Sequence, residues 1–294
     1  MRYLLGIGIG LLIGIIQSSS ALVQKFTILK ADHTKPLMRQ LLRSPLWLLS
    51  VIGTGIFVLV LIIAGQALIG PTLIPGLAAI GMILIPIGAS KFIGEKNGLK
   101  EYLGIGAIIL GVFLLSISKL SINTEEVPWM DPSFFAKTLW YWGGLSGIAL
   151  LALVIGLFQH KRLFFKAILF SVSGGFLYGL SNIIVAPLSY HASVFTQSGI
   201  GSINLPYLFI SAVYLLLINI YSITITQKAF ALGHVSMLIP IQQIPIQIIP
   251  IISHFWFFNG IFPSAFSRFS VPLAIVLILL GAVALGNREA AVQR

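Results

Sequence analysis

Apolar residues in this sequence run in long stretches instead of alternating with polar ones. A helix needs about 20 mostly apolar residues to cross a bilayer, because the hydrocarbon is roughly 30 Å thick and each helical residue rises about 1.5 Å. Nine stretches meet this requirement, and none has Asp, Glu, Lys or Arg in its interior. The pattern therefore predicts nine transmembrane helices, at about Tyr3–Gln24, Leu46–Ala67, Pro71–Ser90, Tyr102–Ser118, Leu139–Phe158, Ala167–Pro187, Leu205–Thr226, Val235–Phe255 and Phe269–Gly286.

The basic residues in the connecting loops predict the orientation of the chain. Lys and Arg close to the ends of spans stay cytoplasmic. With the N-terminus outside, 14 of the 18 Lys and Arg residues fall on the cytoplasmic side, and only Arg2, Lys119, Lys137 and Arg268 fall outside. We therefore expect an outside N-terminus and a cytoplasmic C-terminus.

The first apolar stretch has an alternative interpretation as a signal peptide, because Arg2, an apolar run and the small residues Ser18–Ala21 resemble its three regions. Cleavage there would place the five basic residues from Lys25 to Arg43 outside and invert the charge asymmetry. We therefore interpret this stretch as the first span.

Composition supports a membrane protein and excludes other classes. Charged residues make up 9% of the chain and hydrophobic residues 57%, whereas a soluble domain has about 25% charged residues. The net charge of +11 is explained by basic loops, so we expect no nucleic-acid partner. The absence of Cys excludes thiolate chemistry, and the sequence lacks the short motifs of hydrolases and phosphate-binding enzymes. We expect a protein that is not an enzyme and needs no cofactor.

An internal repeat connects the two halves of the chain. Leu73-Ile74-Pro75 recurs as Leu238-Ile239-Pro240, and both spans carry further prolines. The third span begins outside and the eighth inside, so the matched segments cross in opposite directions. Inverted repeats are typical of secondary transporters, although a three-residue identity can also arise by chance in so apolar a chain. We predict an all-α membrane protein with halves at 1–120 and 139–294 joined by a loop at 121–138, and hinges at Pro75, Pro86, Pro240, Pro245 and Pro250.

Several short motifs resemble the drug/metabolite transporter superfamily, and within it the NIPA-type magnesium transporters. Those motifs are Ser18–Ser20 followed by Phe26–Lys30, Trp47, Pro71–Pro75, Gly94-Glu95, Asp131-Pro132 and Ser236–Ile241. The resemblance covers nearly the whole chain and implies a multi-pass transporter of a small polar solute or of Mg²⁺, working by alternating access.

The second span departs from this family at one position. The family carries a Gly-Glu pair there, whereas Gly55–Leu61 is entirely apolar, with Val58 near the position of the Glu. Mg²⁺ is usually held through one or two carboxylates and retained waters, and we expect no carboxylate buried in the membrane. The metal ligands are therefore unknown, and a site of carbonyls and amides stays open.

Neutral polar residues inside the spans are the remaining candidates for a substrate site. Unpaired amides are costly in hydrocarbon, so such residues should face the bundle interior or a wet cavity. Gln243 and Gln247 share one face of the eighth span, between prolines that leave carbonyl groups without helical partners. The predicted substrate-binding residues are Gln17, Ser18, Asn182, Asn219, Tyr221, Gln243 and Gln247. As an alternative, these groups bond across helices and only hold them together.

Two features concern packing and the membrane surface. Glycines recur every fourth residue at Gly6/Gly10/Gly14, Gly143/Gly147 and Gly175/Gly179, which predicts close helix contacts. Trp129, Trp140, Trp142 and Trp256, with Tyr141, lie near predicted outer ends, where aromatic rings anchor at headgroup level.

The sequence thus leaves two hypotheses of different classes. The first is a transporter in a plasma or inner membrane, with the bilayer and a small solute or cation as partners and a homodimer as an open possibility. The second is a membrane scaffold or assembly partner that transports nothing.

Overall fold

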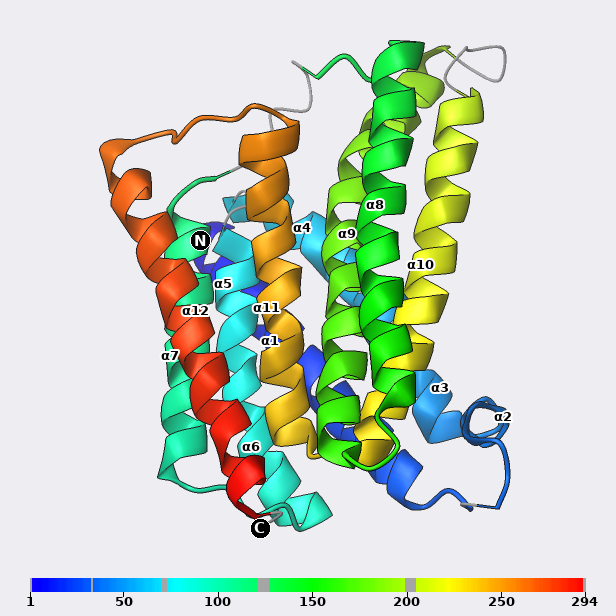
Figure 1. Ribbon diagram of the computed structural model, residues 1–294. Helices are drawn as coiled ribbons and strands as arrows, with labels where there is room; N and C mark the ends of the chain where they lie inside the picture. The colour runs from blue at the N-terminus through cyan, green and yellow to red at the C-terminus, as the bar shows by residue number, and fades with distance from the viewer. Residues whose placement is uncertain (1, 33, 70–72, 121–126, 199–204, 293–294) are drawn as a thin grey trace. The chain divides into compact units, whose positions relative to one another are not determined.

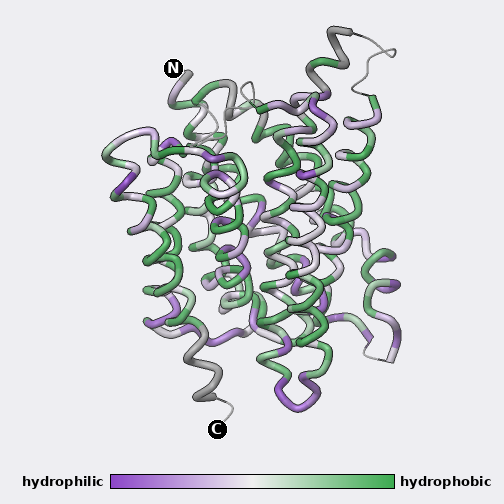
Figure 2. The backbone as a smooth tube through the Cα atoms, turned by 45° about the horizontal axis from the view of Figure 1, so that its top comes forward, coloured by the Kyte–Doolittle hydropathy of each residue, from purple (hydrophilic) through white to green (hydrophobic). Residues whose placement is uncertain are grey.

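All regular elements of the described residues are helices. The computed structural model describes residues 2–32, 34–69, 73–120, 127–198 and 205–292. Figure 2 shows hydrophobic residues along much of the length of these helices. The helices are α1 (Arg2–Leu29), α2 (Leu37–Leu41), α3 (Pro45–Ile52), α4 (Val58–Ile69), α5 (Leu73–Ile80), α6 (Leu84–Gly88), α7 (Leu99–Ile117), α8 (Pro132–Phe158), α9 (Leu163–Ser198), α10 (Leu205–Leu232), α11 (Val235–Ile252) and α12 (Ala265–Val292) (Figure 1).

Short segments of other helical types join some of these helices. The π-helical segment η1 (Gly53–Phe57) joins α3 to α4, and the 3₁₀ turn η2 (Gly81–Ile83) joins α5 to α6. A second π-helical segment, η3 (Ala89–Ile93), extends α6. A third π segment, η4 (Ser253–Phe257), extends α11.

Nine helical segments among the described residues are long and apolar enough to cross a membrane, which confirms the predicted number of spans. They are Tyr3–Leu29, Pro45–Ile62, Leu73–Ile93, Leu99–Ile117, Pro132–Phe158, Leu163–Leu188, Leu205–Leu232, Val235–Phe257 and Ala265–Leu285. The protein is therefore an integral, multi-pass helical membrane protein suited to a lipid bilayer.

Several predicted span boundaries were wrong. The first span continues past Gln24 to Leu29 and so contains Lys25, and the fourth begins at Leu99 and contains Glu101. Both side chains are buried. Lys25 lies near the end of its helix and Glu101 in the first turn of α7, so the prediction that no charged residue lies in the interior of a span stays a prediction. Pro71, the predicted start of the third span, and residues 121–126 of the predicted central loop lie outside the described residues.

The described chain divides into two compact units. Unit 1 is Met1–Leu120, Gln227–Ile241 and Phe262–Arg294, and unit 2 is Ser121–Thr226 and Gln242–Ile261. The helices α10 and α11 contribute residues to both units. The inverted repeat, its halves and the positions of the termini stay predictions.

Unit 1 is built around two helix packings. Helix α1 packs against α4 and α5, and α7 lies along α12 (Figure 1). The α7–α12 contact depends on glycine, since a Cβ atom added to Gly104 would lie 2.9 Å from the carbonyl oxygen of Gly281. Val58 is buried in a cluster with Ile13 and Ile74. The residue near the family's Glu position is thus part of an apolar core.

Unit 2 is organised by the packing of α8 along α9. Trp142 is buried in a cluster with Leu180, Ile184 and Ile218, and Trp129 is fully buried as well. The prediction that all four tryptophans anchor at the membrane surface was wrong for these two, because their rings pack inside the protein. Trp140 and Trp256 are exposed.

The close helix contacts predicted at three sets of glycines are found for two sets and not for the third. Cβ atoms added at Gly6, Gly10 and Gly14 of α1, or at Gly175 and Gly179 of α9, would collide with neighbouring helices, as the close-packing prediction requires. Cβ atoms at Gly143 and Gly147 would meet nothing within 4 Å among the described residues. The prediction was therefore wrong for α8, whose glycine face is open.

Candidate functional site

A buried lysine binds the C-terminal end of α10. Lys25 of α1 has a relative exposure of 6%, and its Nζ donates to the carbonyl oxygen of Gly233, over 2.8 Å, and to that of Phe230. The last carbonyls of a helix have no helical partners and carry a partial negative charge. The ammonium group supplies both the hydrogen bonds and the opposite charge.

A buried glutamate binds the N-terminal end of α11. Glu95 also has a relative exposure of 6%. Its Oε1 accepts from the backbone amide of Val235 (2.8 Å), and its Oε2 accepts from the amide of Ser236 (3.1 Å) and from its hydroxyl (2.7 Å). The first amides of a helix carry a partial positive charge, so a carboxylate is favourable there.

Gly94 helps to position this carboxylate. Its φ of +81° lies in the left-handed region, which glycine adopts without steric cost, and it ends the η3 segment. The amide of Glu95 then donates to the carbonyl oxygen of Ala89 (3.1 Å). The Gly94-Glu95 motif therefore turns the chain out of the third span and fixes the residue that binds α11.

Neutral polar side chains extend this arrangement across unit 1. The amide of Gln227 on α10 donates to the Gln24 carbonyl on α1 (2.7 Å), and the Trp47 indole on α3 donates to the Gln227 carbonyl (3.2 Å). All three side chains are buried. Lys25, Glu95, Gln24, Gln227 and Trp47 together form the turn clamp around Phe230–Ser236, where α10 reverses into α11.

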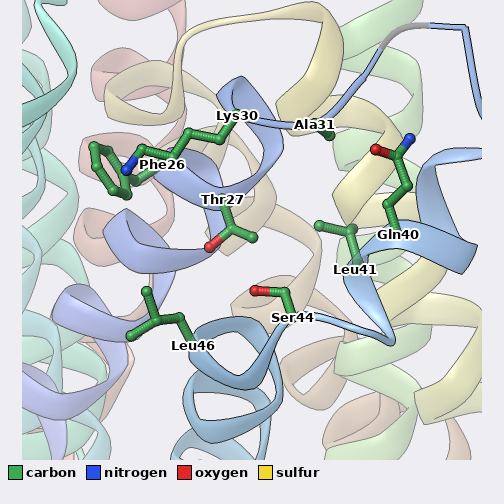
Figure 3. A pocket seen from close by; sticks show the side chains of 8 residues that line it. All are labelled: Phe26, Thr27, Lys30, Ala31, Gln40, Leu41, Ser44 and Leu46. Atoms are coloured by element: carbon green, nitrogen blue, oxygen red, sulfur yellow. The ribbon is translucent and has the colours of Figure 1, made fainter.

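A small cavity of about 230 Å³ lies at the C-terminal end of α1 in the same unit. In Figure 3, Thr27 and Ser44 point their hydroxyl groups into the space between α1 and α3, and Leu41 lies beside them. The Lys30 ammonium is turned over the Phe26 ring, 4.1 Å from its centroid. Thr27 and Ser44 already have backbone partners, since Thr27 donates to Val23 and Ser44 accepts from Trp47.

Unit 2 has its own polar cluster, on α9, α10 and α11. The amide of Gln242 donates to the Thr226 hydroxyl (2.8 Å), and the Ser222 hydroxyl donates to the carbonyl oxygen of Gly174 (2.8 Å). A Cβ atom on Gly174 would lie 2.6 Å from the Thr226 hydroxyl, so glycine lets α9 approach these groups. Neutral polar groups thus meet in the buried part of three spans.

Three of the predicted substrate residues, Asn219 on α10 and Gln243 and Gln247 on α11, lie half-buried in unit 2. The Gln247 amide lies 3.4 Å from the Gln243 carbonyl oxygen, which places both side chains on one face of α11. The Asn219 amide donates to the Ser181 hydroxyl (2.9 Å) and to the carbonyl oxygen of Leu215 (2.8 Å). Asn219 therefore joins α10 to α9, as the packing alternative expects, and Gln243 and Gln247 form a pair.

The other predicted substrate residues differ in their exposure. Gln17, Asn182 and Tyr221 are exposed, and Ser18 is buried. Gln17 and Ser18 belong to unit 1, whereas Asn182 and Tyr221 belong to unit 2 with the Gln243–Gln247 pair.

The predicted hinge prolines occupy different environments. Pro75 is exposed, Pro250 is half-buried, and Pro86, Pro240 and Pro245 are buried. The carbonyl oxygen of Pro86 accepts from the Asn97 amide (2.9 Å). Helix α11 runs through Pro240, Pro245 and Pro250 without a break in its assignment. Their role as hinges stays a prediction.

Sequence reasoning missed the residues of the turn clamp as site residues. Lys25 was placed in a loop because hydropathy ends a span at the first charge, and Glu95 was noted only as part of a family-like motif. Glu95 and Glu101 are buried within the protein, Glu95 between two candidate spans and Glu101 in the first turn of α7, so the expectation that no carboxylate is buried in the membrane stays a prediction. In the sequence, the Gly94-Glu95 pair could have indicated this site, since a glycine before a lone acidic residue at a span end is typical of a turn.

The metal-binding capacity of the described residues is limited. They contain no group of three or more His, Asp or Glu side chains that could hold a metal ion. Glu95 uses both oxygens to bind amides and a hydroxyl. The side-chain oxygens of Gln243 and Gln247 are neutral groups that could coordinate a cation.

Comparisons of the chain with protein-family models, with curated proteins and with solved structures found no match.

Proposed function

We propose that this protein is a transporter of the drug/metabolite superfamily type, which moves a small polar solute or cation by alternating access. The family-like motifs carry the superfamily assignment and suggest Mg²⁺ as the first cation to test. The proposed arrangement is an inverted repeat with the N-terminus outside and the C-terminus in the cytoplasm of a plasma or inner membrane.

The observation that carries the proposal is the polarity of α11. Three glutamines, Gln242, Gln243 and Gln247, lie among three prolines inside a span, and Gln243 and Gln247 are half-buried on one face. Amides inside a membrane need polar partners, and transporter sites near the midplane are typically built from such interrupted helices. The pair could coordinate a solute or cation through its carbonyl oxygens.

The boundary between the two compact units supports α11 as the moving element. On α11 it falls between Ile241 and Gln242, one residue after Pro240. Each proline removes a backbone amide donor from the helix and weakens its resistance to bending. We propose that α11 bends near Pro240 and Pro245 during transport, while the turn clamp holds its N-terminal end.

Reconstitution into proteoliposomes with a Mg²⁺-sensitive dye inside tests the cation version. We expect Mg²⁺ entry above that of empty liposomes, and a loss of about tenfold or more in Gln243→Leu, since a lost ligand to a charged group costs about 1.5–3 kcal/mol. Gln159→Leu, at the C-terminal end of α8, is the matched control and should keep the wild-type rate. No Mg²⁺ entry, together with no effect of Gln243→Leu on any solute tested, would contradict the proposal.

The second candidate function is a membrane scaffold that transports nothing. The bonds of Gln24, Gln227 and Gln242 favour it, since each of these amides is buried and bonded to a protein partner. If scaffolding is the function, Gln243→Leu should change the stability of the protein, and no solute flux should be found.

A further inference from the structure

Unit 2 contains an apolar groove whose lining includes Pro245 but neither Gln243 nor Gln247. The groove has a volume of about 390 Å³ and lies between α8, α9 and the second part of α11. Its walls are formed largely by Leu145, Ile148, Val172, Phe176, Ile248 and Ile252. Ile148 and Ile252 are each about half exposed, so the groove is open along one side.

Polar and amphipathic groups gather at only one end of this groove. The hydroxyl groups of Tyr141 and Ser253 lie 2.7 Å apart there, and the Trp256 ring, 73% exposed, lies 5.9 Å from the Tyr141 ring. The other end is lined by Ile148, Val172 and Ile244. Tyrosine and tryptophan rings are typical of the headgroup level of a membrane, which places this end at the interface and the rest in hydrocarbon.

A lysine lies next to the polar end. Lys137 precedes Tyr141 by one helical turn on α8, and its Nζ lies 5.4 Å from the centroid of the Phe257 ring. Lys137 is exposed, and no described acidic residue forms a salt bridge with it. Its ammonium group is therefore available to a phosphate at the mouth of the groove.

The length of the groove matches one leaflet of a bilayer. From Ile244 to Trp256 it follows α11 for about 18 Å, given a rise of about 1.5 Å per residue. The hydrocarbon of one leaflet is about 15 Å deep, half of the roughly 30 Å core. An acyl chain that starts at headgroup level would therefore end near the apolar end of the groove.

We propose that the groove binds one phospholipid, with an acyl chain between α8, α9 and α11 and the phosphate at Lys137. The lining offers nothing to a polar solute, and an apolar solute would not need the cation or the interfacial rings at one end. A phospholipid matches both ends of the groove, because its acyl chain is apolar and its headgroup carries a phosphate. The site is independent of the proposed transport function, because lipid retention is measured without any flux.

Native mass spectrometry of the purified full chain tests this site. After repeated detergent exchange in the presence of a phosphatidylglycerol of defined mass, the wild type should retain one lipid per chain. Ile248→Trp fills the groove and should lower the retained fraction about tenfold, since burial of each methylene contributes about 0.8 kcal/mol. Lys137→Gln should lower it about fivefold, since a basic residue at the surface contributes about 1 kcal/mol.

Matched variants serve as controls. Leu151→Trp adds the same side chain to an exposed position of α8 outside the groove, and Arg268→Gln removes another exposed basic residue. Both should retain lipid as the wild type does. Lys137→Gln changes an exposed side chain and so keeps the test valid if Ile248→Trp does not fold.

Two results would overturn the proposal. One is equal lipid retention in the wild type, Ile248→Trp and Lys137→Gln. The other is a lipid-free dimer that Ile248→Trp dissociates, because the groove would then hold a second copy of the chain.

Discussion

Lys25 and Glu95 bind opposite sides of the same helix reversal. The Nζ of Lys25 lies 2.8 Å from the carbonyl oxygen of Gly233, where α10 ends, and Oε1 of Glu95 lies 2.8 Å from the amide nitrogen of Val235, where α11 begins. The cation meets the negative end of one helix and the anion the positive end of the next. Two buried charges are thus each stabilised by a helix end, and the reversal is held by residues far away in sequence.

Loss of the lysine should destabilise unit 1. Lys25→Met keeps much of the side-chain volume and leaves buried carbonyl oxygens of Phe230 and Gly233 without this donor. We expect the free energy of unfolding in detergent to fall by about 2 kcal/mol or more, because hydrogen bonds from charged donors contribute about 1.5–3 kcal/mol. Lys30→Met, which removes an exposed cation over a ring, should cost less than about 1 kcal/mol. Equal losses in both variants would contradict the role of Lys25.

Substitutions of Glu95 should form a graded series. Glu95→Ala removes every acceptor for Val235 and Ser236 and should lower the free energy of unfolding by about 3 kcal/mol. Glu95→Gln keeps one carbonyl oxygen but no negative charge, so about half of that loss is expected. Thermal unfolding monitored by circular dichroism measures both. If Glu95→Ala is as stable as the wild type, the carboxylate does not hold α11.

The approach of α9 to α11 should depend on a glycine. A Cβ atom at Gly175 would lie 2.5 Å from the carbonyl oxygen of Gln242 and 2.6 Å from Cγ of Pro245. Gly175→Ala should therefore cost about 1–3 kcal/mol through overpacking. Gly147→Ala, on the open face of α8, should be neutral or stabilising by up to about 1 kcal/mol, since alanine favours the helix. Comparison of the two variants in the same unfolding experiment separates the effect of steric overlap from that of helix propensity.

The start of α8 should respond to pH through Asp131. The backbone amide of Ser133 donates to its Oδ1 over 2.9 Å, and this bond, with the Ser133 side chain, holds the pKa of the carboxyl below its usual 3.8. A lowered pKa stabilises the folded state above the unfolded pKa of about 3.9. This stability is lost as pH falls through the folded value.

Comparison of the wild type with Asp131→Asn tests this effect. The difference in thermal midpoint between the two proteins should be present at pH 7 and shrink below pH about 4. The change should be small, because the carboxyl is fully exposed. A difference that stays constant over this range would show that the charge of Asp131 does not stabilise α8.

Hydropathy predicted the nine spans because each is a long apolar run, and the bilayer imposes that pattern on any helix that crosses it. It placed the end of the first span too early, since a transfer scale treats Lys25 as a residue that needs water. The scale contains no information about Phe230 and Gly233, whose carbonyl oxygens replace that water.

Predictions for the contacts of individual side chains were less accurate, because the sequence does not show which residues the fold brings together. Gln243 and Gln247 share a face because they are four residues apart, so spacing alone predicted their proximity. Glu95 meets Ser236 only through the tertiary fold. Gly143 and Gly147 have the same spacing as Gly175 and Gly179, but a Cβ atom added to either would meet no described atom within 4 Å. Spacing identifies a helix face but not what that face contacts.

The most direct test of the transport proposal is the accessibility of position 243 from each side of the membrane. The chain contains no Cys, so Gln243→Cys introduces the only thiol, and Leu151→Cys on the exposed face of α8 is the lipid-facing control. Labelling with a membrane-impermeant maleimide in right-side-out and inside-out vesicles reports on both sides. We expect Gln243→Cys to be labelled from both sides and Leu151→Cys from neither. A position 243 that reacts from one side only, or from neither, would contradict alternating access.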